Sequence, residues 1–308
     1  MRNIQSAFVT GATGAVGTAL VRALTECGIR VMVLCRPDSS RMSNLPKHPL
    51  LSVCAGDLRK LSEAQVQEHF DAFFHLAWMG TSGPARNDMY LQNENVRCAL
   101  DAVELAARLG CSVFVGVGSQ AEYGRVEGKL TDQTSAFPEN GYGIAKLCAG
   151  QMSRIACVQK GMEHVWARIL SVYGPCDNPN SLVMSVISSL LKGESPRCTL
   201  GEQKWDYLYS EDAARALLAM ARSGKDGAVY PLGGGQTHLL REYIFKIRDA
   251  VNPALSVELG AIPYPAKQVM FLCADLEHLT RDTGFVPQVT FEKGIQKTVE
   301  WAKGRQQA

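Results

Sequence analysis

The sequence predicts an α/β fold: a doubly wound parallel sheet with a smaller substrate lobe interleaved in the C-terminal part of the chain. In the first half, short runs of β-branched and apolar residues alternate with longer amphipathic stretches. Strands that are regularly separated by helices form parallel sheets through right-handed crossovers. The runs predicted as strands are 6–10, 30–34, 51–54, 72–76, 112–117 and 165–170. The stretches predicted as helices are 14–27, 62–69, 88–109 and 142–160.

The regular alternation stops after Tyr173-Gly174-Pro175, beyond which glycine and proline punctuate shorter elements. A helix over 210–221 and a strand over 228–232 are expected to return to the sheet. We therefore expect one domain over 1–172, joined by 208–232, and a lobe formed mainly by 173–308.

The composition is typical of a globular protein and favours a small-molecule substrate. The 308 residues are enough for one large or two intimate domains, and a net charge of +2 gives no basic surface for nucleic acid. Ten cysteines lie scattered without a C-x-x-C pair, which indicates reduced thiols rather than disulfides or a metal site. No apolar run approaches the roughly 18 residues of a membrane span, and the first strand begins close to Met1. We expect a cytoplasmic protein without a membrane partner.

A glycine-rich turn follows the first predicted strand and opens the first helix. Glycines three residues apart let the backbone turn tightly and approach a pyrophosphate at the helix N-terminus, where free N–H groups and the helix dipole favour an anion. The strand, the helix and the place near the chain start all agree with this arrangement. The turn therefore predicts a Rossmann dinucleotide site that includes Gly11, Thr13, Gly14, Ala15, Val16 and Gly17.

The end of the second predicted strand distinguishes the two nicotinamide cofactors. An acidic residue there bonds the ribose hydroxyls of NAD and repels a 2′-phosphate, whereas an arginine accepts that phosphate. The strand is followed by Cys35-Arg36, with no carboxylate at this place, so Arg36 favours NADP(H). If Arg36 is merely solvated and Asp38 turns inward, NAD(H) is the alternative. Asp57, after the third strand, is placed to accept from the adenine amino group or to cap the next helix.

Three further residues have the types and spacing that carbonyl chemistry needs. Tyr142 and Lys146 lie one helical turn apart on the same face. A phenol with a pKa of about 10 exchanges protons poorly at neutral pH unless a neighbouring ammonium stabilises the phenolate. Ser119 ends an apolar strand, at the carboxyl edge where parallel sheets bind ligands. We predict that Ser119 holds a substrate oxygen while Tyr142 exchanges the proton and a nicotinamide exchanges the hydride.

Motifs along nearly the whole chain carry a family resemblance. They are the glycine turn, His75-Leu76-Ala77-Trp78, Asn95, the segment 118–124, Tyr142 with Lys146, the segment 168–175, Trp205-Asp206-Tyr207, Asp212-Ala213-Ala214 and the closing segment 284–301. With them the chain resembles the extended short-chain dehydrogenases/reductases of the NAD-dependent epimerase/dehydratase group, which act mostly on nucleotide-diphosphate sugars. The resemblance implies that Ser119, Tyr142 and Lys146 are the catalytic triad and that Lys146 also holds the nicotinamide ribose. It adds Leu58, Leu76 and Ala77 to the expected cofactor contacts.

Departures from the group's patterns narrow the reaction that the resemblance implies. Its 4,6-dehydratases have a threonine at the serine position, followed by the Asp-Glu pair that eliminates water, whereas Ser119 is followed by Gln120-Ala121. Dehydration is therefore not expected. Together with Arg36, this favours NADPH-dependent reduction of a 4-keto nucleotide-diphosphate sugar in deoxysugar biosynthesis. A NAD-dependent nucleotide-sugar 4-epimerase is the first alternative, and a non-catalytic dinucleotide-sensing protein is the second.

The substrate side of the site is expected to include Trp78, Ser119, Gln120, Glu122, Ser171 and Trp205. Trp78 is alternatively a core anchor, and Glu122 is alternatively a surface partner of Arg125. Members of the group often place Asn where Ser171 stands and, where Trp205 stands, an Arg that contacts the substrate's diphosphate. Either another cation (Lys204, Arg241 or Arg281) replaces that charge or the substrate lacks a diphosphate. As in the group, the helices over 88–109 and 142–160 have enough apolar surface for a homodimer interface. The alternative is that either helix is covered within one chain.

Overall fold

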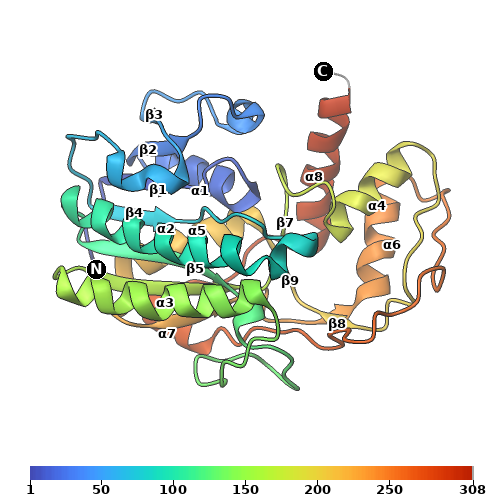
Figure 1. Cartoon of the computed structure of the whole chain (residues 1–308). Helices are drawn as coiled ribbons and strands as arrows, with labels where there is room; N and C mark the ends of the chain where they lie inside the picture. Colours follow the sequence, from blue (N-terminus) through green and yellow to red (C-terminus); the bar gives the residue numbers. More distant parts are fainter. Residues whose placement is uncertain (307–308) are drawn as a thin grey trace.

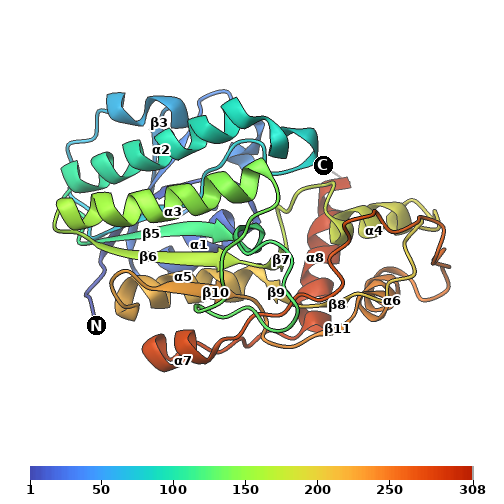
Figure 2. The same ribbon diagram turned by 60° about the horizontal axis from the view of Figure 1, so that its bottom comes forward.

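A seven-stranded parallel sheet forms the centre of the molecule. The structure, a computed structural model, describes residues 1–306, and the strands run in the order β10-β6-β5-β4-β1-β2-β3 (Figures 1 and 2). Their bounds are β1 (Ser6–Thr10), β2 (Arg30–Cys35), β3 (Leu51–Ala55), β4 (Ala72–His75), β5 (Val113–Ser119), β6 (Glu163–Ile169) and β10 (Val229–Leu232). The order places the carboxyl ends of β1, β4 and β5 side by side, which is where a doubly wound sheet binds its ligand.

Helices cover both faces of this sheet. One face carries α2 (Met89–Arg108) and α3 (Gly141–Gln159), which lie side by side in both views, and the other carries α1 (Ala15–Glu26) and α5 (Ser210–Ser223) (Figures 1 and 2). Successive side chains of β1 alternate between the two cores: Ala7 and Val9 pack towards α1 and α5, and Phe8 packs towards α2. Because both faces are buried, the strands are continuous apolar runs rather than alternating ones.

The predicted helix over 62–69 is wrong. The chain there forms the short 3-10 helix η2 (Leu58–Glu63) and then runs without helix or strand to Phe70. Of the residues expected to be helical, Ala64 and Val66 contact the core, and both are only partly buried. A helix of two turns is marginal in water unless an apolar face packs firmly, and this stretch offers too small a face.

A second core lies in the C-terminal lobe. It forms between α4 (Leu182–Leu191), α6 (Leu240–Val251) and α8 (Phe291–Gln306), which pack together beside the sheet domain (Figure 2). Two small sheets connect the lobe to the sheet domain: β7 (Ser171–Tyr173) pairs with β9 (Tyr207–Tyr209), and β8 (Lys204–Trp205) pairs with β11 (His238–Leu239). The chain then returns to the central sheet as α5 and β10, so the lobe is interleaved with it as the sequence predicts.

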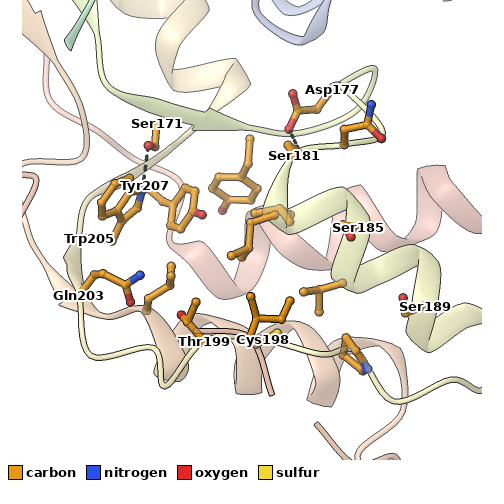
Figure 3. A pocket seen from close by; sticks show the side chains of 18 of the residues that line it. Ser171, Asp177, Ser181, Ser185, Ser189, Cys198, Thr199, Gln203, Trp205 and Tyr207 are labelled. Atoms are coloured by element: carbon orange, nitrogen blue, oxygen red, sulfur yellow. Dashed lines mark hydrogen bonds between the residues drawn. The ribbon is translucent and has the colours of Figure 1, made fainter. Parts of the chain in front are cut away.

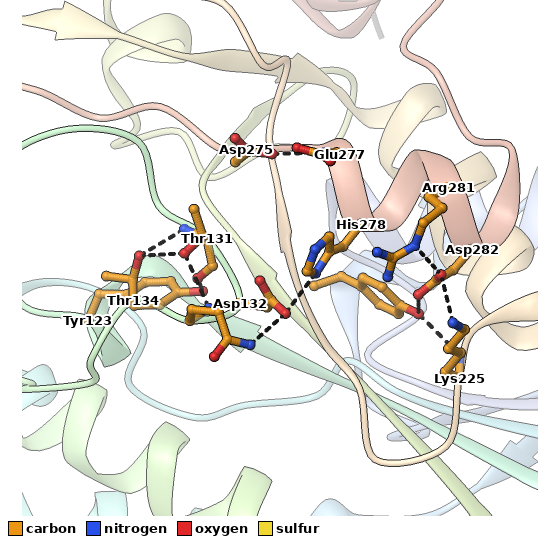
Figure 4. A network of polar contacts seen from close by, with 12 residues as sticks. Tyr123, Thr131, Asp132, Thr134, Lys225, Asp275, Glu277, His278, Arg281 and Asp282 are labelled. Carbon is orange, nitrogen blue, oxygen red and sulfur yellow. Dashed lines mark hydrogen bonds and ion pairs between the residues drawn. The ribbon is translucent and has the colours of Figure 1, made fainter.

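The segment after β5 is tied to α7 (Glu277–Thr283) by a polar network (Figure 4). The Leu130 amide donates to the Cys273 carbonyl oxygen and its own carbonyl accepts from Asp275, both at 2.8 Å. Asp132 contacts His278 Nδ1 at 2.7 Å. These contacts hold the long β5–α3 connection against the segment that leads into α7. Among the described residues, none of the helices combines the length and apolar character that a membrane crossing requires.

Candidate active site

The glycine turn between β1 and α1 has the shape of a phosphate cradle. Gly11 has a φ of +76°, and a Cβ there would lie 2.5 Å from the Ala77 amide nitrogen, so only glycine fits. A Cβ at Gly17 would collide with the Gly11 carbonyl oxygen, because α1 packs directly on the turn. Gly14, in contrast, has no atom within 4 Å of a Cβ placed on it. Two glycines thus close the turn, and the third leaves open space in front of the helix N-terminus, which fits a bound pyrophosphate.

We expect Gly17→Ala and Gly14→Ala to separate folding from binding. The Gly17→Ala methyl must displace the turn backbone, so it should lower the free energy of unfolding by about 1–3 kcal/mol. Gly14→Ala adds a methyl to open space at an ordinary φ of −87° and should leave stability unchanged while weakening dinucleotide binding. Urea unfolding and dinucleotide titration by calorimetry measure the two effects. Equal dinucleotide affinity for Gly14→Ala and the native protein would show that the cradle is not a phosphate site.

The other predicted cofactor residues follow the carboxyl ends of β2, β3 and β4. Arg36, directly after β2, is exposed and forms no ion pair with any residue that the structure describes. Asp57 caps η2 through its hydrogen bond from the Arg59 amide (2.8 Å), which is the helix-capping role anticipated for it. Leu58 and, after β4, Leu76 and Ala77 are half-buried.

Ser119, Tyr142 and Lys146 meet at the carboxyl edge of β5. Ser119 ends that strand, and Tyr142 and Lys146 project from the first two turns of α3, which begins at Gly141 with Asn140 as its capping residue. Tyr142 is 8% exposed. Burial holds the pKa of its phenol above the ordinary value, and a hydrogen bond to Ser119 and the positive charge of Arg86 offset part of that rise. The structure thus places a serine hydroxyl and a phenol together at the sheet edge.

Lys146 is buried between the sheet and the loop that follows β4. Its Nζ donates to the Val117 carbonyl oxygen (2.6 Å) and lies 3.8 Å from the centroid of the Trp78 ring. Burial lowers the pKa of Lys146 to about 7, against a smaller upward effect of Glu122. Burial therefore disfavours the charged form of this amine, and the carboxylate of Glu122 favours it.

The loop that carries Trp78 is anchored by two buried amides of α2. Asn95 exchanges hydrogen bonds with the Met79 backbone, accepting at 2.8 Å and donating at 2.9 Å. Gln92 donates to the carbonyl oxygens of Gly80 (3.0 Å) and Ala85 (2.9 Å) and accepts from Trp78 Nε1 (2.9 Å). Trp78 is consequently fixed edge-on to Tyr142, with ring centroids 6.2 Å apart. Trp78 faces the triad, and sequence reasoning missed the role of Gln92 in placing it.

The prediction that Glu122 contacts substrate is corrected by its burial. Its side chain is 0% exposed; one oxygen accepts from Arg168 Nε at 2.7 Å, and the other accepts from the Ser119 amide at 2.7 Å. Trp166 Nε1 donates to both oxygens at 3.2 Å. The alternative pairing with Arg125 is also wrong, because Arg125 pairs with Glu139. Glu122 is thus part of the support beneath Ser119, whereas Gln120, in the 3-10 helix η4 (Gln120–Glu122), is half-buried.

Ser171 and Trp205 meet in the wall of a cavity of about 570 Å³ in the C-terminal lobe (Figure 3). Trp205 Nε1 donates to Ser171 Oγ at 2.8 Å, so the two departures from the family pattern are partners of each other. Around them the cavity presents hydroxyl and amide groups from Ser181, Ser185, Thr199 and Gln203. Gln203 is 3% exposed, and its Oε1 has no hydrogen-bond partner among the described residues. The cavity wall thus combines these polar groups with apolar side chains such as Val172, Val186 and Leu240.

The cavity wall does not include any of the three cations anticipated in place of the family arginine. Lys204, Arg241 and Arg281 do not line the cavity, and Arg281 instead pairs with Asp282 on α7 (Figure 4). The basic side chain among the described lining residues is Arg197, which is exposed at the rim. The first residues of α4, which Ser181 caps, also line this cavity.

The fold and this arrangement define an extended short-chain dehydrogenase/reductase. The chain matches the model of the NAD dependent epimerase/dehydratase family over residues 7–233 and belongs to this family.

Two curated relatives illustrate the range of the family. A dTDP-glucose 4,6-dehydratase from Escherichia coli is 32% identical over 179 residues, which cover 56% of this chain and 50% of that protein, so the match spans about half of the relative's length. A CDP-abequose synthase from Salmonella typhimurium is 25% identical over 306 residues, covering 95% of this chain and 97% of that protein.

Solved structures share the fold over almost the whole chain. UDP-N-acetylglucosamine 4-epimerase from Methanobrevibacter ruminantium, in complex with UDP-N-acetylmuramic acid, has a TM-score of 0.89 at 23% identity and covers 99% of this chain and 100% of its own. RMD from Pseudomonas aeruginosa, complexed with NADPH, has a TM-score of 0.82 at 22% identity, covering 98% and 99%.

Proposed function

We propose that this chain reduces the 4-keto group of a nucleotide-diphosphate sugar with NADPH, in deoxysugar biosynthesis. The observation that carries the proposal is the meeting of Ser119, Tyr142 and Lys146 at the sheet edge next to the glycine cradle. We assign dinucleotide binding to residues 1–172 with 208–232, and substrate binding mainly to 173–308. The full-length likeness to a CDP-abequose synthase and the NADPH in the Pseudomonas structure support the choice of substrate and cofactor.

In this reaction the protein's own residues bind the carbonyl oxygen and supply the proton. Bound NADPH supplies the hydride for the carbonyl carbon. Ser119 donates a hydrogen bond to the carbonyl oxygen and orients it, and Tyr142 Oη gives its proton to that oxygen as the alcohol forms. Lys146 binds the nicotinamide ribose. Trp78, Gln120, Ser171 and Trp205 border the sugar and its nucleotide.

Water elimination is a poorer fit to this site. It needs a free acid and a free base beside the sugar, and Gln120 and Ala121 supply neither. The nearby carboxylate of Glu122 is fully engaged by Arg168, Trp166 and the Ser119 amide. The similarity to dehydratases therefore reflects the shared scaffold rather than a shared reaction.

The lobe cavity is the proposed seat of the nucleotide. Its size suits a group of that bulk, since ligand pockets commonly measure about 300–1,000 Å³. The N–H groups at the start of α4 and the rim guanidinium of Arg197 are the donors available to a diphosphate where Trp205 replaces an arginine.

Purified protein tests the reaction directly. With 4-keto-6-deoxy CDP- and dTDP-sugars we expect NADPH to be consumed in a one-to-one ratio with product. No consumption with any of these sugars, together with interconversion of a C4 hydroxyl pair by protein-bound NAD, would favour the 4-epimerase instead. Dinucleotide binding without either reaction would favour the sensing protein.

The cofactor choice rests on Arg36 and is tested by Arg36→Gln. A charge-assisted bond between a guanidinium and a phosphate contributes about 1.5–3 kcal/mol. We therefore expect the dissociation constant for NADPH to rise by about tenfold to a hundredfold, while that for NADH stays the same. Fluorescence titration of both dinucleotides measures this. An equal loss for both, or no loss for NADPH, would show that Arg36 does not bind a 2′-phosphate.

We also propose a homodimer through α2 and α3. The outer face of α3 carries the exposed apolar side chains of Ile144, Met152, Ile155 and Val158. On a helix, residues three and four apart share a face, so most of this set forms a continuous stripe. A partner helix pair would cover it.

A further inference from the structure

Arg86 holds a positive charge against the ring of Tyr142. It lies in the 3-10 helix η3 (Gly83–Asn87) of the loop between β4 and α2. Its guanidinium carbon is 4.3 Å from the centroid of the Tyr142 ring. The guanidinium donates to the Thr81 carbonyl oxygen (3.1 Å) and forms no ion pair with any described residue. A cation without a carboxylate partner is thus placed directly on the proposed proton donor.

The loop is built to keep Arg86 in this place. Gln92 binds the Ala85 carbonyl oxygen, one residue before Arg86. On the other side, Asn87 Oδ1 accepts from the Gly141 amide (3.0 Å), one residue before Tyr142. Both neighbours of Arg86 are therefore tied to the helices that frame the site. The chain on both sides of Arg86 is thereby held in place next to Tyr142.

Arg86 is closer to Tyr142 than the lysine of the triad is. Lys146 Nζ lies 6.0 Å from the centroid of the Tyr142 ring and 3.8 Å from that of Trp78. Burial lowers the pKa of Lys146 to about 7, against an upward effect of Glu122. A guanidinium keeps its charge throughout the physiological range. The other groups facing Tyr142 are the Ser119 hydroxyl, which stabilises the phenolate, and Glu122, whose charge opposes it.

We propose that Arg86 is a positioning residue for the proton transfer: its guanidinium, fixed over the Tyr142 ring, stabilises the phenolate and makes the phenol a stronger acid. The role in turnover rests on the proposed reduction, but the effect on the phenol does not. The triad thereby gains a permanent charge from the β4–α2 loop. Lys146 contacts Val117 and Trp78, and under the proposed function it binds the ribose.

A titration of the Tyr142 phenol tests this without any substrate. The protein is labelled with ¹³Cζ-tyrosine, and Tyr142→Phe identifies the Tyr142 signal among the nine tyrosines. The pH midpoint is then measured by NMR for the native protein, Arg86→Met and Arg86→Lys. We expect Arg86→Met to raise the midpoint by about one pH unit, because a cation on an aromatic face is removed. Arg86→Lys should restore most of that shift.

The matched control is Arg248→Met, which removes a guanidinium lying 5.1 Å from the Phe245 ring on α6 in the C-terminal lobe. It should leave the Tyr142 midpoint unchanged. Circular dichroism checks the fold, and Arg86→Gln serves if Arg86→Met does not fold. Equal midpoints in the native protein and the neutral variant would overturn the proposal. So would a midpoint that is lower in Arg86→Met than in the native protein, since removing a stabilising cation must raise it. If the shift is found but no 4-keto sugar is reduced, the proposed function fails, while the effect of Arg86 on the Tyr142 phenol stands.

Discussion

Replacing Tyr142 with Phe is expected to slow NADPH oxidation by about a hundredfold to ten-thousandfold, the range that a general acid contributes. The variant keeps the ring, so its contacts with Arg86 and Trp78 persist. It removes the phenolic oxygen, which is the proposed proton donor to the substrate. Steady-state kinetics with a 4-keto nucleotide sugar measures the loss.

Dinucleotide binding separates a chemical role of Tyr142 from a structural one. We expect the dissociation constant for NADPH to change little in Tyr142→Phe, because the substitution removes only the phenolic oxygen and leaves the glycine cradle and Arg36 unchanged. A variant that turns over at the native rate would contradict the proposed proton donor. One that loses NADPH binding in proportion to its activity would show that Tyr142 supports the cofactor site instead.

The largest effect on stability is expected from Glu122→Gln. Glu122 and Arg168 form a buried pair with side chains 0% and 6% exposed. Glutamine keeps the size of the side chain but leaves the guanidinium without a counter-charge, and breaking a buried pair in this way costs about 3–5 kcal/mol. Urea unfolding, monitored by tryptophan fluorescence, measures the change. Because the Ser119 amide also binds Glu122, the activity of the folded fraction should fall as well.

Glu139→Gln is the matched control for this change. Glu139 pairs with Arg125 on the surface, with both side chains substantially exposed, and exposed pairs contribute little because solvent screens them. Its loss should leave the free energy of unfolding almost unchanged. Similar losses in the two variants would mean that the pair beneath Ser119 is not the electrostatic support inferred from its burial.

The features predicted well from the sequence are those encoded locally. The glycine turn is specified by its spacing, and the strands are specified by apolar runs because a parallel sheet is buried on both faces. Tyr142 and Lys146 could be paired because one helical turn separates them. Ser119 could be placed because the carboxyl ends of parallel strands share one edge of the sheet.

The features that could not be predicted depend on partners far apart in the chain. Glu122 and Arg168 are 46 residues apart, and Ser171 and Trp205 are 34 apart. Helical and strand periods relate only residues that are close in the sequence, so they could not reveal these pairs. By themselves, Glu122, Ser171 and Trp205 are therefore each interpreted as a possible substrate contact. One signal did exist: Ser171 and Trp205 both departed from the family pattern, and a joint departure is what a hydrogen-bonded pair would produce. Arg86 gave no such signal.

The central claim is that hydride passes from free NADPH to C4 of the sugar. Incubation with NADPH carrying deuterium at the transferred position of C4 of the nicotinamide, followed by mass spectrometry and NMR of the product, tests it most directly. We expect one deuterium at C4 of each product molecule and an equal amount of released NADP⁺. Products that carry no deuterium, formed while the dinucleotide stays bound and unchanged in total amount, would contradict the reductase and indicate that the substrate's own hydrogen returns to it.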